Sequence, residues 1–182
     1  MTPDPPMTND PMTNDHSNNN SMSSADNFFD LLRHPIKFRL FLLSKLPSAF
    51  FSGVRVRYAD EGKAVVTVPY KWFSTNPFGS TYFACQSMAA EMSTGVLAMA
   101  YTYKQQPAIS MLVLRVEGNF SKKATGLTTF VCEDGHIVKQ MIKEACASGK
   151  PTTVTMRSVG TNIKNELIAE FAITWSFKVK SK

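Results

Sequence analysis

The stretch that decides the fold is NPFGSTYFACQSMAAEMSTGVLAMAYTYK, residues 76–104. Between Ser80 and Tyr103 it contains a single charged residue, Glu91. A helix on the surface of a soluble protein carries charged residues on its solvent side, so a run without them predicts a helix that is buried on all sides. A run of about 24 residues corresponds to roughly 36 Å of α-helix.

The residues around this run predict strands and one shorter helix. Alternating or β-branched composition indicates strands at 54–58, 64–68, 110–117, 127–133, 152–159 and 166–178, and helical spacing indicates a helix at 136–147. The order is helix, two strands, long helix, two strands, short helix, two strands, which is typical of an α+β domain with an antiparallel sheet. Because the long helix lacks a charged face, we expect the sheet to wrap around it.

The N-terminal part of the chain differs in composition from the rest. Residues 1–26 lack aromatic residues and are rich in Asn, Ser and Pro, so they predict a disordered polar tail. The following residues, 27–182, are enough for one domain with a full core.

A basic amphipathic helix is predicted between Pro35 and Pro47, with Ile36, Leu40 and Leu43 on one face. Phe38, Phe41 and Leu42 widen this apolar stripe. Such a helix can lie on a membrane. This one is short, so packing against its own domain is favoured, and membrane contact by residues 28–50 is the less favoured alternative.

Charge restricts the partners without choosing among them. The chain has a net charge of +6, and residues 1–26 hold four Asp and no Lys or Arg. The remainder therefore carries 20 basic and 10 acidic residues, a net charge of +10. This balance suits an anionic ligand, nucleic acid or a membrane surface, and an ordinary solvated surface is the alternative. We expect no nucleic-acid binding, because the aromatic residues lie in apolar runs and no recognition motif is present.

Metal and thiol chemistry find little support in the sequence. Cys85, Cys132 and Cys146 fit no metal-binding spacing, and the three His residues are scattered. We expect reduced, buried thiols and no metal site. No secretory signal is visible, and the long helix is rich in Ser, Thr and Gln, so a cytoplasmic protein is expected.

Glu91 is the candidate functional residue of the long helix. An unpaired buried carboxylate would cost several kcal/mol, so Glu91 must be paired, be protonated or face a wet cleft. In a wet cleft it can act as a general base. On the residues alone, an ion pair with an arginine on a strand is favoured, and the candidates are Arg55, Arg57, Arg115 and Arg157.

The same stretch resembles the signature of phenylacetate-pathway-type acyl-CoA thioesterases. In that family a loop Asn is followed six residues later by His-Gly-Gly, and fifteen residues later by an acidic residue on the central helix. Counted from Asn76, the acidic position falls on Glu91. The stretches NFSKKATGLTTF and ELIAEFAITWSFK are also similar to the family, so the resemblance covers roughly residues 50–180. It is closest to a thioesterase-like branch of unknown function.

The resemblance implies a hotdog fold, in which an antiparallel sheet wraps a long central helix. An extra N-terminal helix and a short helix before the last two strands are expected as additions. The family's His falls on Tyr82, and its two glycines fall on Phe83 and Ala84. These residues retain the backbone amides that form an oxyanion hole in the family, although their β-carbons obstruct the close approach that glycine allows.

The resemblance further implies thioester hydrolysis at a site between two protomers. Glu91 would activate or orient water, the amides of Phe83 or Ala84 would hold the carbonyl oxygen, and Tyr82 would donate a hydrogen bond. Asn76 matches the family, with a loop-capping role as the alternative. The implied assembly is a homodimer or a dimer of dimers. Coenzyme A is part of the substrate, with no separate cofactor, and candidates for its phosphates are Lys122, Lys123 and Arg157, each of which is otherwise an ordinary surface charge.

The same fold has two alternative functions. A dehydratase needs a His in the loop before the helix, and residues 70–83 contain none. A non-catalytic protein that binds acyl-CoA or lipid, or a purely structural one, is the main alternative. The missing His-Gly-Gly favours it, whereas Glu91 and Asn76 favour an enzyme.

Overall fold

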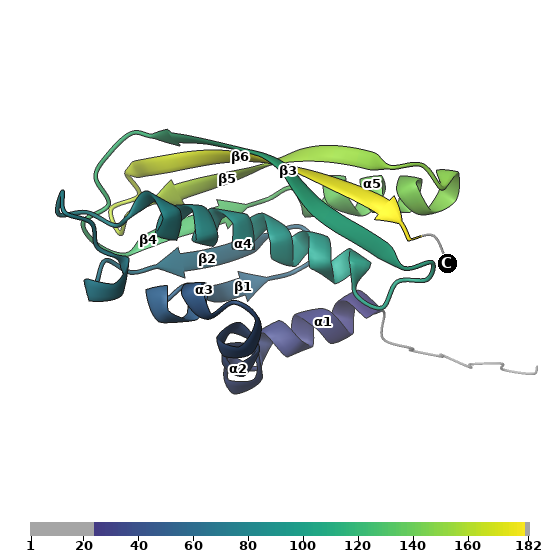
Figure 1. Cartoon of the computed structure of the whole chain (residues 1–182), viewed down its shortest axis with the longest axis horizontal. Coiled ribbons are helices and arrows are strands. Elements are labelled where there is room, and N and C mark those ends of the chain that lie inside the picture. Colours follow the sequence, from purple (N-terminus) through teal and green to yellow (C-terminus); the bar gives the residue numbers. More distant parts are fainter. Residues whose placement is uncertain (1–23, 181–182) are drawn as a thin grey trace, which may run out of the picture.

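Six antiparallel strands form one sheet in the computed structural model, which describes residues 24–180 (Figure 1). Their order across the sheet is β1-β2-β4-β5-β6-β3. The predicted succession of strands and helices from residue 54 onward is confirmed. The strands are β1 (Arg55–Ala59), β2 (Ala64–Val68), β3 (Ile109–Phe120), β4 (Thr128–Cys132), β5 (Thr152–Thr161) and β6 (Leu167–Val179).

The long helix is α4 (Phe83–Thr102), and it contacts all six strands. Ala89, Ala90 and Leu97 are fully buried against them. The prediction of burial on all sides was wrong in one respect. Along one stripe the side chains are only half-buried within residues 24–180; we call it the uncovered stripe, and it is formed by Ala84, Ser87, Met88 and Glu91.

The other helices lie at the two ends of α4. The shorter predicted helix is α5 (Gly135–Ser148), which contacts α4, β5 and β6. It buries Val138, Ile142 and Ala145. No helix in the stretch 24–180 is long and apolar enough to cross a membrane.

The N-terminal region contains three short helices where the sequence predicted one. They are α1 (Ser24–Arg33), α2 (Pro35–Lys45) and α3 (Pro47–Ser52). Proline begins both α2 and α3, since its missing N–H costs nothing at a helix start. Residues 24–26, which the sequence assigned to the tail, belong to α1; the rest of the predicted tail, residues 1–23, lies outside the described part of the chain.

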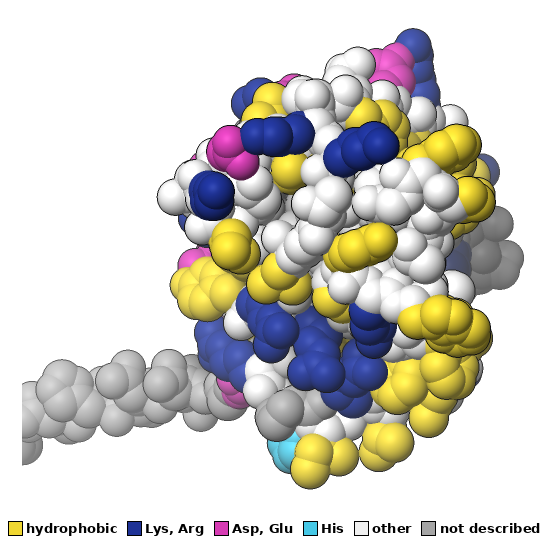
Figure 2. Space-filling model, turned by 90° about the vertical axis from the view of Figure 1, so that its left-hand side faces the viewer, with side chains coloured by type: hydrophobic (Ala, Val, Ile, Leu, Met, Phe, Trp, Pro, Cys, Tyr) yellow, Lys and Arg dark blue, Asp and Glu magenta, His cyan; other side chains and the backbone are white. Residues whose placement is uncertain are grey.

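The orientation of α2 also differs from the prediction. Phe38 and Leu42 face the core, whereas Ile36, Leu40 and Leu43 are exposed. Figure 2, which looks at the left-hand side of Figure 1, shows Lys and Arg side chains gathered in its lower half and bordered by hydrophobic side chains.

Two glycines on the sheet leave room for the rings of two core phenylalanines. Gly160 on β5 pairs with Phe130 on β4, and Gly118 on β3 pairs with Phe171 on β6. A β-carbon at Gly160 would lie 2.4 Å from the ring of Phe130, and one at Gly118 would lie 2.7 Å from the ring of Phe171. The two rings meet edge to face at 5.8 Å. Each ring therefore lies across the glycine of the neighbouring strand.

We expect Gly160→Ala to destabilise the protein by about 1–3 kcal/mol, because Phe130 is fully buried and cannot move away from the new methyl group. Gly126→Ala is the matched control, since a β-carbon there would have no neighbour within 4 Å. Urea unfolding followed by circular dichroism measures both. Equal midpoints for the two variants would show that Phe130 does not lie across Gly160.

Candidate functional site

The loop before α4 is closed by backbone hydrogen bonds at its base. The amide of Tyr82 donates to the carbonyl oxygen of Ser74 at 2.7 Å, and Thr75 pairs with Thr81 in an isolated bridge. At the tip, Asn76 Oδ1 accepts from the amides of Phe78 and Ser80 at 3.0 and 3.3 Å. Asn76 therefore caps its own loop, which was the alternative to a catalytic role.

A pocket of about 530 Å³ lies between this loop, the start of α4 and the segment after β3. It brings together five residues that the sequence singled out, from two separate segments of the chain. Ala84, Glu91 and Arg157 are not part of its lining. The five are Asn76, Tyr82, Phe83, Lys122 and Lys123.

The start of α4 offers two free backbone donors near this pocket. The amides of Cys85 and Gln86 both donate to the carbonyl oxygen of Tyr82. Within the described residues, the amides of Phe83 and Ala84 have no acceptor, as expected for the first residues of a helix. The positive end of the helix dipole adds to the attraction for an anionic oxygen here. The sequence predicted these two backbone donors. Whether a ligand can reach them depends on the neighbouring rings of Tyr82 and Phe83, which are exposed.

Gln86 was missed by the sequence analysis. Its side chain is buried and lines the pocket, with Nε2 donating to the carbonyl oxygen of Thr81 at 3.1 Å. Within the described part of the chain, Gln86 Oε1 and Thr81 Oγ1 have no hydrogen-bond partner. Buried polar atoms rarely lack a hydrogen-bond partner, so a ligand or water in the pocket would supply the missing hydrogen bonds. The signal available in the sequence was the amide side chain of Gln86, about one turn after the start of an otherwise apolar helix.

Glu91 lies eight residues beyond Phe83, about 12 Å further along α4. Its carboxylate lies over Gly95 and beside the ring of Trp175. That ring cannot donate to it, because Trp175 Nε1 donates to Thr94 Oγ1 at 2.9 Å. Burial raises the pKa of the Glu91 carboxyl. The carboxylate is therefore desolvated, half-buried and available to take a proton.

The ion pair predicted for Glu91 is absent among residues 24–180. Arg115 pairs with Glu117, Arg157 pairs with Glu170, and Arg57 donates to Thr67 Oγ1. No salt bridge or side-chain hydrogen bond in this range involves the Glu91 carboxylate, so the favoured explanation for this residue was wrong.

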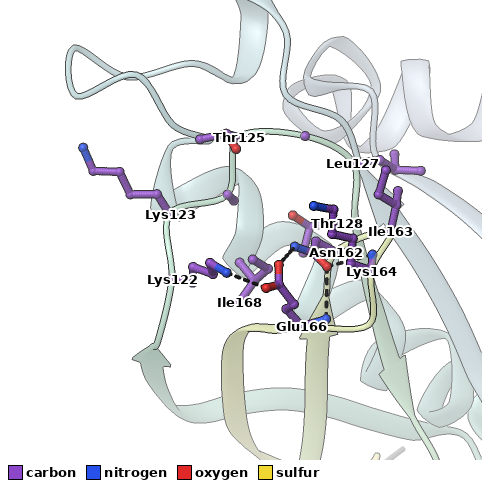
Figure 3. A pocket seen from close by; sticks show the side chains of 12 residues that line it. Lys122, Lys123, Thr125, Leu127, Thr128, Asn162, Ile163, Lys164, Glu166 and Ile168 are labelled. Atoms are coloured by element: carbon purple, nitrogen blue, oxygen red, sulfur yellow. Dashed lines mark hydrogen bonds and ion pairs between the residues drawn. The ribbon is translucent and has the colours of Figure 1, made fainter.

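Of the three cations suggested for coenzyme A, Lys122 and Lys123 line the same pocket and Arg157 lies elsewhere. Lys122 Nζ bonds Glu166 at 2.7 Å, and Lys123 Nζ donates to the carbonyl oxygen of Phe78 at 3.2 Å. Figure 3 shows the neighbouring hollow of about 320 Å³ that these lysines also line, with Lys122 directed at Glu166 and Lys123 extending away. Arg157 lies on β5 in a different depression, beside Glu133 and Asp134.

Metal chemistry finds no support in the described region. No group of three or more His, Cys, Asp or Glu within residues 24–180 is arranged to hold a metal ion. Cys85 and Cys132 are buried, Cys146 is half-buried, and all three are free thiols.

We expect Glu91→Gln to raise the melting temperature near pH 8. Because the pKa of Glu91 is raised in the folded state, the wild type loses stability as the pH rises through that pKa, and the neutral variant does not. The difference in melting temperature should shrink towards about pH 4, where the unfolded carboxyl is also protonated. Glu144→Gln, at an exposed position on α5, is the control. A Glu91→Gln variant that is less stable than wild type at pH 8 would contradict this assignment.

Comparisons with known proteins rest on structure alone. No protein-family model and no curated protein sequence matches the chain. A "probable thioesterase" of unknown function from Pseudomonas aeruginosa superposes with a TM-score of 0.67 at 20% identity, covering 80% of this chain and 97% of that one. A protein of unknown function from Chlorobaculum tepidum gives 0.67 at 14% identity, covering 80% and 94%.

A thioesterase from Haemophilus influenzae is also similar, with a TM-score of 0.56 at 14% identity over 76% of this chain and 87% of that one. At these identities the likeness establishes the fold. The chain shares with these neighbours the α+β hotdog fold, in which an antiparallel sheet packs around a long central helix.

Proposed function

We propose that the protein hydrolyses acyl thioesters, with acyl-CoA as the substrate class, at a site formed between two copies of the chain. The observation that carries the proposal is the position of Glu91. It is the only charged residue of α4 and lies on the uncovered stripe of that helix. It has no ion-pair partner among the described residues.

The outer edge of β3 supports a homodimer. β3 has 12 residues and, among residues 24–180, pairs only with β6, so no described strand covers its other edge. Val116 and Phe120 pair with Ile173 and Ala169, which face the core, yet both remain about half exposed. Long, apolar edge strands are unusual unless something covers them. A second copy docked along β3 would cover these side chains and enclose the uncovered stripe of α4.

In this arrangement the helix start of one subunit would face Glu91 of the partner subunit. Glu91 would take a proton from water as the water attacks the thioester carbon. The amides of Phe83 and Ala84 would receive the developing negative charge on oxygen, and the thiolate of coenzyme A would leave. A carboxyl whose pKa is raised is better matched to this task near neutral pH than an ordinary one.

The lining of the pocket supports an acyl substrate. Pro77, Phe78 and Phe83 come from the loop and α4, and Phe120 comes from β3. Lys122 and Lys123 lie beside these apolar side chains and would take the phosphates of coenzyme A. Tyr82 would donate its hydroxyl to the substrate. Arg157 lies in a different depression on β5 and has no part in this proposal.

A non-catalytic acyl-binding protein is the second candidate. Two observations favour it: Phe83 and Ala84 stand where the thioesterase pattern has glycines, and Asn76 uses its side-chain oxygen within its own loop. Such a protein would use the same apolar pocket without turnover.

We expect wild type to release thiol from at least one member of a panel of short, medium and long acyl-CoAs. Glu91→Gln should lower kcat by about a hundredfold or more, the usual loss when a general base is removed. Glu144→Gln on α5 is the control, and circular dichroism confirms folding of each variant. A wild type inactive on the whole panel but able to bind acyl-CoA would favour the second candidate. Full activity in Glu91→Gln would exclude Glu91 as the base.

We also expect Val116→Arg to convert a dimer into monomers in sedimentation velocity, and to lower hydrolysis with the dimer fraction. The side chain is 48% exposed in the single chain, so the substitution should leave its fold intact. Ile163→Arg, in the turn between β5 and β6, introduces the same charge at an 81% exposed site and should leave the dimer unchanged. A wild type that sediments as a monomer would rule out a site shared between subunits.

A further inference from the structure

The N-terminal helices carry an apolar surface that is separate from the β3 edge. On α2, Phe38 and Leu42 anchor the helix in the core, and Ile36, Leu40 and Leu43 lie on the opposite side, exposed to solvent. Their spacing of four and three residues places them in one row along the helix. A surface helix normally presents polar residues there, so this row marks a contact surface.

A cluster of aromatic rings lies in the neighbouring elements α3 and η1 (Trp72–Ser74). Phe51 stacks on Phe73 with centroids 5.5 Å apart, and Trp72 meets Phe73 edge to face at 5.5 Å. Trp72 is 85% exposed, so nothing in the described chain covers the largest apolar side chain of the region. Exposed Trp is characteristic of the boundary between water and a lipid bilayer.

Basic side chains connect the two apolar groups. The Arg39 guanidinium lies 3.9 Å from the ring centre of Phe50 and donates to the carbonyl oxygen of Val54 at 3.3 Å. Arg55 is close enough to Arg39 to interact electrostatically, and the Lys71 ammonium lies against Gly53. Figure 2 shows such a group of Lys and Arg bordered by hydrophobic side chains.

These cations lack acidic partners. Within residues 24–180, no salt bridge involves Arg39, Arg55 or Lys71, whereas Lys63, Arg115, Lys122, Lys139 and Arg157 are each paired with a glutamate. Three unpaired cations held between two exposed apolar groups form a surface of a single charge sign. We call it the α2–η1 surface: the exposed row of α2, Phe51, Trp72 and Phe73, with Arg39, Arg55 and Lys71.

We propose that the α2–η1 surface docks on a lipid bilayer that contains anionic lipids. A bilayer supplies an apolar layer for Trp72 and the α2 row, and negatively charged headgroups for the cations. A second copy docked on the same surface would bring like charges together, so a symmetric dimer through this surface is disfavoured. A nucleic acid would satisfy the cations but would leave the aliphatic row of α2 in water.

Docking here would place the candidate site beside the membrane. The carbonyl oxygen of Ser74, at the end of η1, accepts from the amide of Tyr82, the residue that caps α4. The turn that carries Trp72 is therefore joined directly to the helix start that lines the pocket. Long-chain acyl thioesters, which partition into bilayers, would be delivered from that surface. This last step rests on the proposed hydrolysis, whereas the docking itself does not.

Vesicle sedimentation tests the proposal on the full chain without requiring catalysis. Wild type should sediment with vesicles of phosphatidylcholine containing about one third phosphatidylglycerol, and weakly with phosphatidylcholine alone. Trp72→Ser should lower the partition coefficient about tenfold or more. Arg55→Glu should lower it about fivefold per unit of charge changed. Ile137→Ser on α5 and Lys150→Glu after it are the matched controls and should bind as wild type.

Tryptophan fluorescence gives an independent readout. The chain has two Trp residues; Trp175 is 4% exposed, so a blue shift on adding vesicles reports on Trp72 and should vanish in Trp72→Ser. Absence of binding to anionic vesicles, or equal losses in the control variants, would overturn the proposal. So would a Trp72→Ser variant that binds vesicles normally but loses self-association in sedimentation velocity, because the surface would then be a protein interface.

Discussion

Burial of α4 against the sheet is the interaction on which the rest of the structure depends. The helix is long and nearly free of charge, so its polar side chains must find partners inside the protein. Ser93 bonds Ser158 on β5 at 2.8 Å, and Thr94 accepts from Trp175 on β6. These bonds fix the rotation of the helix against the strands. The rotation in turn leaves Glu91 on the uncovered stripe, where its carboxylate is desolvated but unpaired.

The sequence predicted the parts of the fold that depend on local pattern. The charge-free run located α4, and the alternating pattern of residues 166–178 located β6. The orientation of α2 was wrong because both of its faces are apolar, and periodicity cannot tell which face meets the core. The ion pair of Glu91 was wrong for a similar reason. Composition indicates that a buried carboxylate needs an explanation, but only the strand register decides which arginines are near.

The sequence predicted those parts of the candidate site that consist of backbone groups. Phe83 and Ala84 place the same two amides at the helix start that glycines would, because every residue except proline has an N–H. Side-chain roles were less predictable. Asn76 is held in its loop by local hydrogen bonds, and the unsatisfied Gln86 Oε1 depends on how tightly Thr81 and the loop close over it. Such properties are set by packing distances that a sequence motif does not encode.

The two exposed apolar surfaces are distinguished by their charges. At the β3 edge, Arg115 pairs with Glu117, so both signs of charge are present on one strand. A two-fold axis perpendicular to β3 at Val116 would bring Arg115 of each copy towards Glu117 of the other, which suits contact between identical copies. The α2–η1 surface has only cations beside its apolar residues, and the same operation there brings like charges together. Self-association through β3 and contact with an anionic bilayer through α2 and η1 are therefore compatible in one molecule, with the pocket at the start of α4 between them.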